Sequence, residues 1–272
     1  MGFLFKSLLR VGAGCGLIGY LAAPAQVSEA AFRPFQNRYI AHRGLHSGKD
    51  GVVPENSLAA FAAACENGYG IELDVQLSAD GQVVVFHDDN LKRVCGVNKP
   101  VCALSLKELQ SLSLLGSEET IPLFSDVLDL VAGRGPLIVE LKNGRQNKEL
   151  CEKTLALLRA YDGPFCVESF APDIVHWFRL NAPDIVRGQL ACSIEGYAKE
   201  SPKPVAFAMS RCLMNVWSRP HFIAYELTKK PIPVRFAELL GAKRVCWTSR
   251  KPGDEVDQDT VIFEGYRPEG WF

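Results

Sequence analysis

Short apolar runs recur along the chain, and most are separated by stretches in which apolar residues have helical spacing. Strands are predicted at residues 38–41, 71–77, 83–86, 136–142, 164–169, 185–190, 222–225, 244–248 and 261–263. Helices are predicted at residues 54–68, 123–131, 148–161, 173–180, 205–216 and 234–240. Because strands and helices alternate, the pattern indicates α/β architecture with a parallel sheet. Nine strands are one more than a closed eight-stranded α/β barrel holds, and the sequence does not say which one lies outside.

One connection breaks the alternation. Only eight residues, Val75 to Gln82, link the second and third predicted strands. A helical crossover needs a dozen or more residues, so this connection is either a hairpin or an extended return without a helix. Residues 88–120 then lack a clear period and contain one short helical candidate at 105–112. They are interpreted as an insertion.

The length of 272 residues suits one large α/β barrel or two smaller domains. The regular alternation favours one domain, over residues 36–272. Thirty basic and 31 acidic residues give a formal charge of −1, and no basic block interrupts the chain. This balance argues against nucleic acid as a partner.

The first 26 residues have the pattern of a targeting segment. Lys6 and Arg10 precede an apolar run from Val11 to Ala25, and Ala23-Pro24-Ala25 resembles a cleavage site. The pattern predicts a signal peptide or an uncleaved N-terminal membrane anchor over residues 1–26, with the domain outside the cytoplasm. The alternative is a disordered or peripheral N-terminus.

Cysteine usage points to the opposite compartment. Nine cysteines are present, and Cys65, Cys166 and Cys246 lie in apolar runs, as expected of buried reduced thiols. No spacing of cysteines and histidines suggests a zinc site. A membrane-anchored or secreted protein and a cytoplasmic one therefore both stay open.

Polar residues gather at the ends of four predicted strands. Glu72 and Asp74 share one strand face, because side chains alternate with a period of two. The ends of parallel strands meet at one face of a barrel, where its chemistry lies. The residues expected to converge there are His42, Arg43, Glu72, Asp74, His87, Glu140 and Lys142.

This set suits phosphoryl chemistry. The three carboxylates would bind a hard divalent cation, Mg²⁺ or Ca²⁺. The two imidazoles can divide the general-acid and general-base roles, and the arginine and lysine would hold an anion. Glycoside hydrolysis needs the acids but not the cations, so it fits less well.

Each of these residues also has a simpler interpretation. Glu72 and Asp74 could form an ordinary half-exposed strand face, and Glu140 with Lys142 a structural ion pair. Two aromatic residues near strand ends could pack in the core or form the floor of a substrate pocket, namely Phe170 and Trp247. The other three histidines are expected to be structural, namely His46, His176 and His221.

An ordered series of motifs carries a family resemblance. They are Ala41-His42-Arg43-Gly44, Pro54-Glu55-Asn56-Ser57, Glu72-Leu73-Asp74-Val75, Asp80-Gly81, Val85-Phe86-His87-Asp88, Glu140-Leu141-Lys142, Ser169-Phe170 and Trp247-Thr248. In this order, over residues 39 to about 250, the chain resembles the glycerophosphodiester phosphodiesterases.

The resemblance implies a TIM (β/α)8 barrel with a small insertion after the third strand. It implies a divalent metal at Glu72, Asp74 and Glu140, and His42 with His87 as the acid/base pair. Phosphate would be bound by two cationic side chains, Arg43 and Lys142. The implied reaction hydrolyses small-molecule glycerophosphodiesters to glycerol 3-phosphate and an alcohol, through attack by the neighbouring glycerol hydroxyl and a cyclic phosphate.

Two departures concern substrate identity. Phe263-Glu264 stands where the family usually has Thr-Asp, and Ser249-Arg250-Lys251 where it often has Asn. The resulting basic character could select a different head group. Lysophospholipase D activity on membrane lysolipids is one alternative, and a non-catalytic surface module that binds sugar phosphates or glycans is another.

Overall fold

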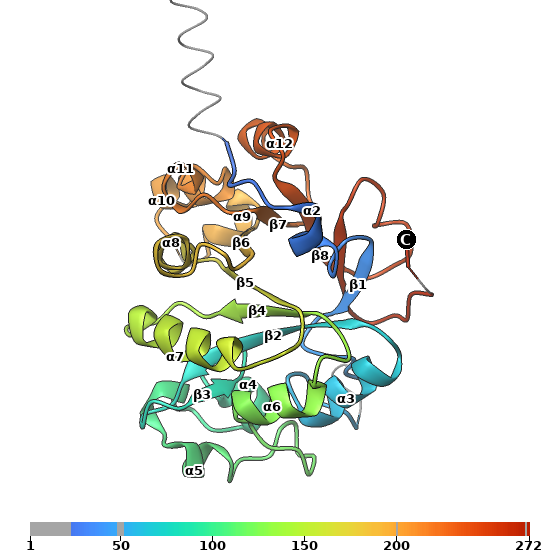
Figure 1. Cartoon of the computed structure of the whole chain (residues 1–272). Coiled ribbons are helices and arrows are strands. Elements are labelled where there is room, and N and C mark those ends of the chain that lie inside the picture. The colour runs from blue at the N-terminus through green and yellow to red at the C-terminus, as the bar shows by residue number, and fades with distance from the viewer. Residues whose placement is uncertain (1–22, 48–51, 200, 270) are drawn as a thin grey trace, which may run out of the picture.

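Eight parallel strands close into a barrel (Figure 1). The computed structural model describes residues 23–47, 52–199, 201–269 and 271–272. The strands are β1 (Arg38–Ala41), β2 (Gly70–Leu77), β4 (Leu137–Leu141), β5 (Phe165–Ser169), β6 (Arg187–Ala191), β7 (Phe222–Glu226), β8 (Lys243–Ser249) and β9 (Thr260–Phe263). Strand β1 pairs with both β2 and β9, which closes the sheet and confirms the predicted TIM barrel.

The ninth predicted strand, β3 (Val83–Val85), lies outside the parallel barrel. It pairs antiparallel with the far end of β2, with Val83 opposite Leu77 and Val85 opposite Val75. Of the two connections that the sequence left open, the hairpin is therefore correct. The turn is closed by Ser78, whose hydroxyl accepts the Gln82 N–H at 2.9 Å. The return strand brings the chain back to the level of Asp74.

The helices surround the barrel (Figure 1). They are α3 (Leu58–Glu66), α6 (Phe124–Val131), α7 (Asn147–Arg159), α8 (Pro172–Asn181), α9 (Ile194–Tyr197), α10 (Lys203–Ser210), α11 (Asn215–Ser218) and α12 (Ile232–Leu239). The single helix predicted over 205–216 is wrong, because Cys212 has a φ of 52° that a continuing α-helix does not allow. The run is divided into α10 and α11.

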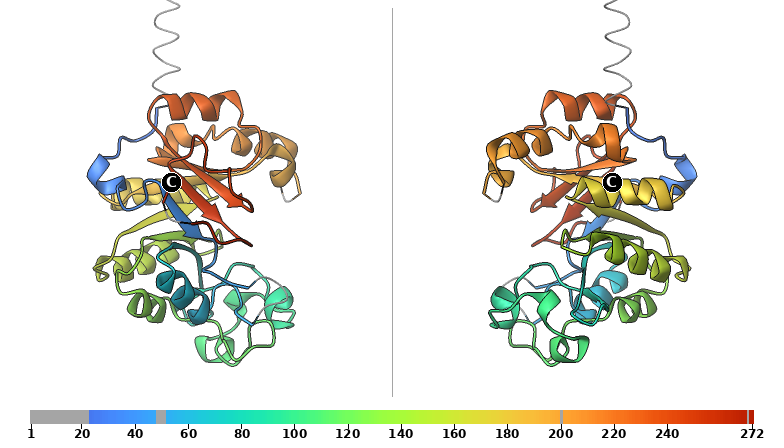
Figure 2. Two further views of the ribbon diagram at one scale, coloured as in Figure 1. Left: turned by 90° about the vertical axis from the view of Figure 1, so that its right-hand side faces the viewer. Right: turned by 90° about the vertical axis from the view of Figure 1, so that its left-hand side faces the viewer.

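The predicted insertion forms a small lobe with its own apolar core. It contains α4 (Lys92–Cys95), a 3₁₀ turn (Val101–Ala103) and α5 (Leu106–Leu109). The lobe packs around a separate cluster of Val84, Phe86, Leu91, Val94, Val101, Leu104, Leu109, Leu114 and Ile121. Figure 2 places it at the end of the molecule opposite α12.

The N-terminal segment closes the bottom of the barrel, where the strands begin. Helix α2 (Glu29–Phe32), which the sequence pattern did not predict, presents Phe32 to the barrel interior, and Phe35 follows. The ring of Phe32 lies 6.3 Å from that of Phe222. The Phe222 ring needs Gly188 beside it, because a Cβ there would lie 2.0 Å from the ring. Apolar packing thus closes this end of the barrel, so a polar site would lie at the opposite end, where the strands finish.

The structure bears on the predicted leader and on the predicted thiols. Residues 1–22 of the predicted leader lie outside the described residues. Within the part of the chain that is described, no helix is long and apolar enough to cross a bilayer. Cys65, Cys166 and Cys246 take part in no disulfide, and the last two are buried.

Candidate active site

Three carboxylates meet at the mouth of the barrel, the face where the parallel strands end. Glu72 and Asp74 come from β2 and Glu140 from the neighbouring β4, where Asp74 and Glu140 are register partners. One carboxylate oxygen of each lies within 4.8 Å of the other two. The predicted convergence of these three residues is therefore present in the fold.

The three carboxylates are buried close together, so ionising all of them is unfavourable. The three residues are 2 %, 1 % and 6 % exposed. Burial, reinforced by the neighbouring carboxylates, raises the pKa of Glu72 well above its usual value and also raises that of Glu140. Asp74 Oδ1 accepts no hydrogen bond among the described residues. A divalent cation would relieve this repulsion and supply a ligand partner for Asp74 Oδ1, so the donor set fits a hard metal ion.

Two cations lie against the carboxylates. Lys142 Nζ is 2.8 Å from Glu140 Oε1 and 3.4 Å from Asp74 Oδ1. Burial alone would lower the pKa of Lys142, but these two carboxylates outweigh it and raise the pKa. Arg43 Nε lies 3.6 Å from Asp74 Oδ2. Both positive side chains therefore stay charged beside the place where an anion would bind.

The turn after β1 aims Arg43 into the mouth. Arg43 has a φ of 56°, and its backbone N–H donates to Glu72 Oε2 at 3.0 Å. Gly44 follows with a φ of 79°, and a Cβ there would lie 2.8 Å from Ala60 Cβ on α3. Only glycine fits this combination of positive φ and close helix approach. The tight turn thus depends on the His-Arg-Gly sequence.

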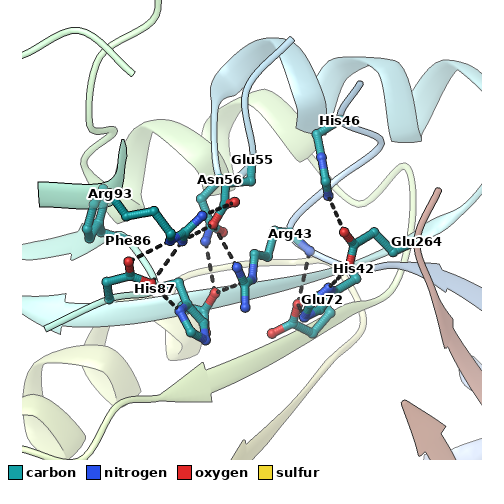
Figure 3. A network of polar contacts seen from close by, with 12 residues as sticks. His42, Arg43, His46, Glu55, Asn56, Glu72, Phe86, His87, Arg93 and Glu264 are labelled. Carbon is teal, nitrogen blue, oxygen red and sulfur yellow. Dashed lines mark hydrogen bonds and ion pairs between the residues drawn. The ribbon is translucent and has the colours of Figure 1, made fainter. Parts of the chain in front are cut away.

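Each predicted catalytic histidine is held by a carboxylate (Figure 3). His42 Nδ1 lies 3.0 Å from Glu264 Oε2, and its Nε2 lies 3.9 Å from Glu72 Oε2. His87 Nδ1 lies 2.6 Å from Asp88 Oδ1. Because an ionised carboxylate only accepts, both imidazoles carry a proton on Nδ1, which leaves Nε2 as the nitrogen for proton transfer.

The insertion supplies a link between the two sides of the site. Arg93 of α4 donates from Nε to Asp88 at 2.7 Å and from both terminal nitrogens to Glu55, each at 2.7 Å. Glu55 in turn accepts from Arg43 at 2.7 Å. The two arginines outweigh the effect of burial and lower the pKa of Glu55 to about 2. One ion-pair chain therefore runs from His87 to Arg43 (Figure 3).

The two aromatic candidates also lie together near the strand ends. Phe170 and Trp247 meet edge to face with ring centroids 5.5 Å apart, and Tyr197 of α9 lies 6.0 Å from Phe170. Trp247 Nε1 donates to the Ala224 carbonyl at 3.0 Å. Both residues are partly buried and pack on the barrel interior. They could contact a substrate at this rim as well as pack.

Five functional candidates received no role from the sequence. Glu55 and Asn56 stand in a quoted motif, Glu264 was named only as a departure from the family, and Arg93 lies in the insertion, where periodicity carries no signal. Asn56 Nδ2 donates to Asp74 Oδ2 at 2.8 Å. A further carboxylate, Glu168 on β5, is 2 % exposed, and burial together with Glu140 and Asp74 raises its pKa well above the usual value. The position of Glu168 at the end of a predicted strand is the feature of the sequence that could have identified it as a site residue.

Comparisons with known proteins agree with this geometry. The model of the glycerophosphoryl diester phosphodiesterase family matches residues 42–265. A glycerophosphodiester phosphodiesterase from Bacillus altitudinis is 41 % identical over 115 residues, which cover 39 % of this chain and 45 % of the relative. Human lysophospholipase D GDPD1 is 27 % identical over 207 residues, covering 71 % of this chain and 59 % of the relative. The chain thus spans about half the length of these curated relatives.

Solved structures share the fold over most of the chain. A phosphodiesterase from Oleispira antarctica in complex with the product sn-glycerol-3-phosphate has a TM-score of 0.70 at 24 % identity, covering 86 % of this chain and 94 % of that one. A glycerophosphodiester phosphodiesterase from Thermotoga maritima has a TM-score of 0.62 at 26 % identity, covering 83 % and 93 %. With the family model matching from His42 to Gly265, the chain belongs to the glycerophosphoryl diester phosphodiesterase family.

Proposed function

We propose that the protein is a divalent-metal-dependent phosphodiesterase that hydrolyses glycerophosphodiesters to glycerol 3-phosphate and an alcohol. The observation that carries this proposal is the pairing of two carboxylate-held imidazoles with a buried triad of acids and two partly buried cations. Family membership and the product named for the Oleispira enzyme support the same reaction class.

The metal would be held by Glu72, Asp74 and Glu140, and oxygen ligands of this kind suit Mg²⁺ or Ca²⁺. When bound, such an ion offsets negative charge on the phosphoryl oxygens and so lowers the barrier to nucleophilic attack. The protein's own cations act on the same group. Arg43 and Lys142 would orient the phosphate, Arg43 through its planar fork and Lys142 as a point charge.

The two histidines would share the proton transfers. One Nε2 accepts the proton of the glycerol hydroxyl next to the phosphate as that oxygen bonds to phosphorus. The other histidine donates a proton to the departing alcohol as its P–O bond breaks, leaving a cyclic phosphate. Water then opens the ring with the two roles reversed, which restores both protonation states. Glu264 and Asp88 keep Nε2 as the reactive nitrogen in each ring.

Replacement of either histidine tests this assignment. His42→Ala and His87→Ala should each lower the rate of glycerol 3-phosphate release from glycerophosphocholine by about 100-fold or more. His176→Ala is the matched control, because His176 lies on α8 and stacks on Trp217 of α11, away from the carboxylates of the mouth. The assignment is wrong if both site variants keep activity within about tenfold of the parent.

Lysophospholipase D activity is the second candidate. It is favoured by the likeness to human and rodent proteins of that name and by the aromatic rim of Phe170, Tyr197 and Trp247. Rates on glycerophosphocholine and on lysophosphatidylcholine micelles distinguish the two substrates. If the purified protein binds glycerophosphodiesters but turns over neither substrate with Mg²⁺ or Ca²⁺, it is a non-catalytic binding module instead.

A further inference from the structure

Helices α10 and α11 expose an unusual number of large apolar side chains. Val205, Phe207, Leu213, Met214, Val216 and Trp217 are each 38 to 47 % exposed. We call these six residues the α10–α11 face. Helix α11 packs against α8, and His176 of α8 stacks on one side of the Trp217 ring at 4.0 Å, so Trp217 stays only partly exposed. Six such residues within thirteen positions exceed the scattered exposure of an ordinary protein surface.

The charged residues within the segment that carries this face have one sign. No Asp or Glu occurs from Ser201 to Tyr225, whereas Lys203, Arg211 and Arg219 are present. The guanidinium of Arg211 lies 3.7 Å above the ring of Phe207. Arginine side chains that cover an aromatic ring in this way are typical of a boundary between apolar and polar surroundings. Apolar and basic residues without acids are typical of segments that bind anionic lipid.

The chain enters the described structure beside this face. Arg219, just after α11, donates to the Ala23 carbonyl, and the Ala25 N–H donates to the Pro220 carbonyl at 3.1 Å. In Figure 1 the first described residues, in blue, start next to α11. The sequence ahead of Ala23 is apolar from Val11 onward and carries Lys6 and Arg10. The first described residues therefore lie beside the end of α11.

The face also leads to the mouth. Helix α9 packs on α10, and Tyr197 of α9 lies 6.0 Å from Phe170 at the end of β5. Helix α9 therefore connects α10 of this face to the aromatic residues at the rim.

A second copy of the chain suits this face less well. A two-fold symmetric contact places a patch against itself. Lys203 and Arg211 would then meet like charges, and the segment contains no acid to pair with them. Anionic phospholipid head groups supply the complementary charge, and the acyl region accepts the apolar side chains.

We propose that the α10–α11 face is a docking surface for an anionic lipid bilayer. Phe207 and Trp217 enter the head-group boundary, and Lys203 with Arg211 contact lipid phosphates. This docking does not depend on phosphodiesterase activity, so its test needs no substrate.

The first test locates Trp217 relative to the bilayer. The full chain is mixed with vesicles of phosphatidylglycerol and phosphatidylcholine that carry bromine on the acyl chains, which quenches nearby tryptophan. Quenching is expected in the parent, and Trp217→Phe should remove most of it, because Trp217 is the tryptophan among the six residues of this face. Equal quenching in the parent and in Trp217→Phe, or none in the parent, would overturn the proposal.

The second test measures affinity. Val205→Ser with Phe207→Ser should weaken co-sedimentation with these vesicles by about tenfold or abolish Trp217 quenching, since two apolar anchors are lost. The matched control is Leu115→Ser with Val256→Ser, which removes two exposed apolar residues outside this face and should leave both readouts unchanged. Circular dichroism checks that both double variants are folded.

Two results distinguish other occupants of the face. If sedimentation velocity without lipid shows a parent dimer that the Val205/Phe207 double variant converts to a monomer, the face joins two copies and the lipid proposal is wrong. The affinity of the parent for purely neutral vesicles, and that of Lys203→Glu for anionic vesicles, should both be lower than the affinity of the parent for anionic vesicles. If all three affinities are equal, the basic residues have no part in binding and the proposal of an anionic surface fails.

Discussion

Replacing Glu264 with Gln tests whether that carboxylate keeps His42 ready for proton transfer. Glu264 Oε2 lies 3.0 Å from His42 Nδ1, and the hydrogen bond from His42 lowers the pKa of Glu264 to about 2. A glutamine oxygen can still accept from Nδ1, so the ring orientation is retained. What is lost is the negative charge that stabilises the imidazolium formed during catalysis.

The size of the effect follows from the surroundings of Glu264. A hydrogen bond to a charged group contributes about 1.5 to 3 kcal/mol. The Glu264 side chain is 21 % exposed, and Arg250 also approaches Oε2, at 3.1 Å. Both features weaken the effect, so we expect about 1.5 to 2 kcal/mol, which is about 10- to 30-fold in kcat. KM should change little, because Glu264 contacts neither Arg43 nor Lys142 in the described structure.

The assay is steady-state release of glycerol 3-phosphate from glycerophosphocholine. Glu238→Gln is the matched control. Glu238, on α12, is also a partly shielded carboxylate, and it pairs with Lys230 at 2.6 Å. Glu264→Gln should have no further effect in a His42→Ala background, because the carboxylate acts through the imidazole. Retention of kcat within about threefold, or full additivity with His42→Ala, would refute the reasoning.

Three further outcomes are expected. Arg93→Ala breaks the ion-pair chain between Asp88 and Glu55 and should lower kcat about tenfold. The melting temperature should stay within a few degrees of that of the parent. An unchanged kcat would show that the insertion does not support the site. Chelation followed by titration of Mg²⁺ or Ca²⁺ should abolish and restore turnover, and calorimetry should detect one bound ion; full activity after exhaustive chelation would contradict the metal assignment. Burial, with Arg187 nearby, lowers the pKa of His221 from 6.5 to about 4, so the unfolded chain binds the proton first. Stability should therefore be full above pH 6.5 and fall by about 3 kcal/mol as the pH drops to 4, measured by urea unfolding, and His221→Gln should flatten this slope.

The sequence alone predicted most of the elements and the residues of the candidate site. Alternation of apolar strands and amphipathic helices predicted the barrel, because each strand must bury both faces and each helix one. The period of two along β2 placed Glu72 and Asp74 on one face, and strand ends marked His42 and Glu140. The short link after Val75 limited the next connection to two possibilities.

The tertiary structure decided what depends on contacts between distant segments. It identified β3 as the strand outside the barrel, since the hairpin partner is chosen by pairing with the free end of β2. It divided the predicted helix at Cys212, where the backbone turns against the local propensity. It also joined Glu264 to His42 over 222 positions and Arg93 to Glu55 over 38. Local periodicity reports which side of an element is buried, but the partner of a polar side chain is set only when the closed sheet brings separate strand ends together.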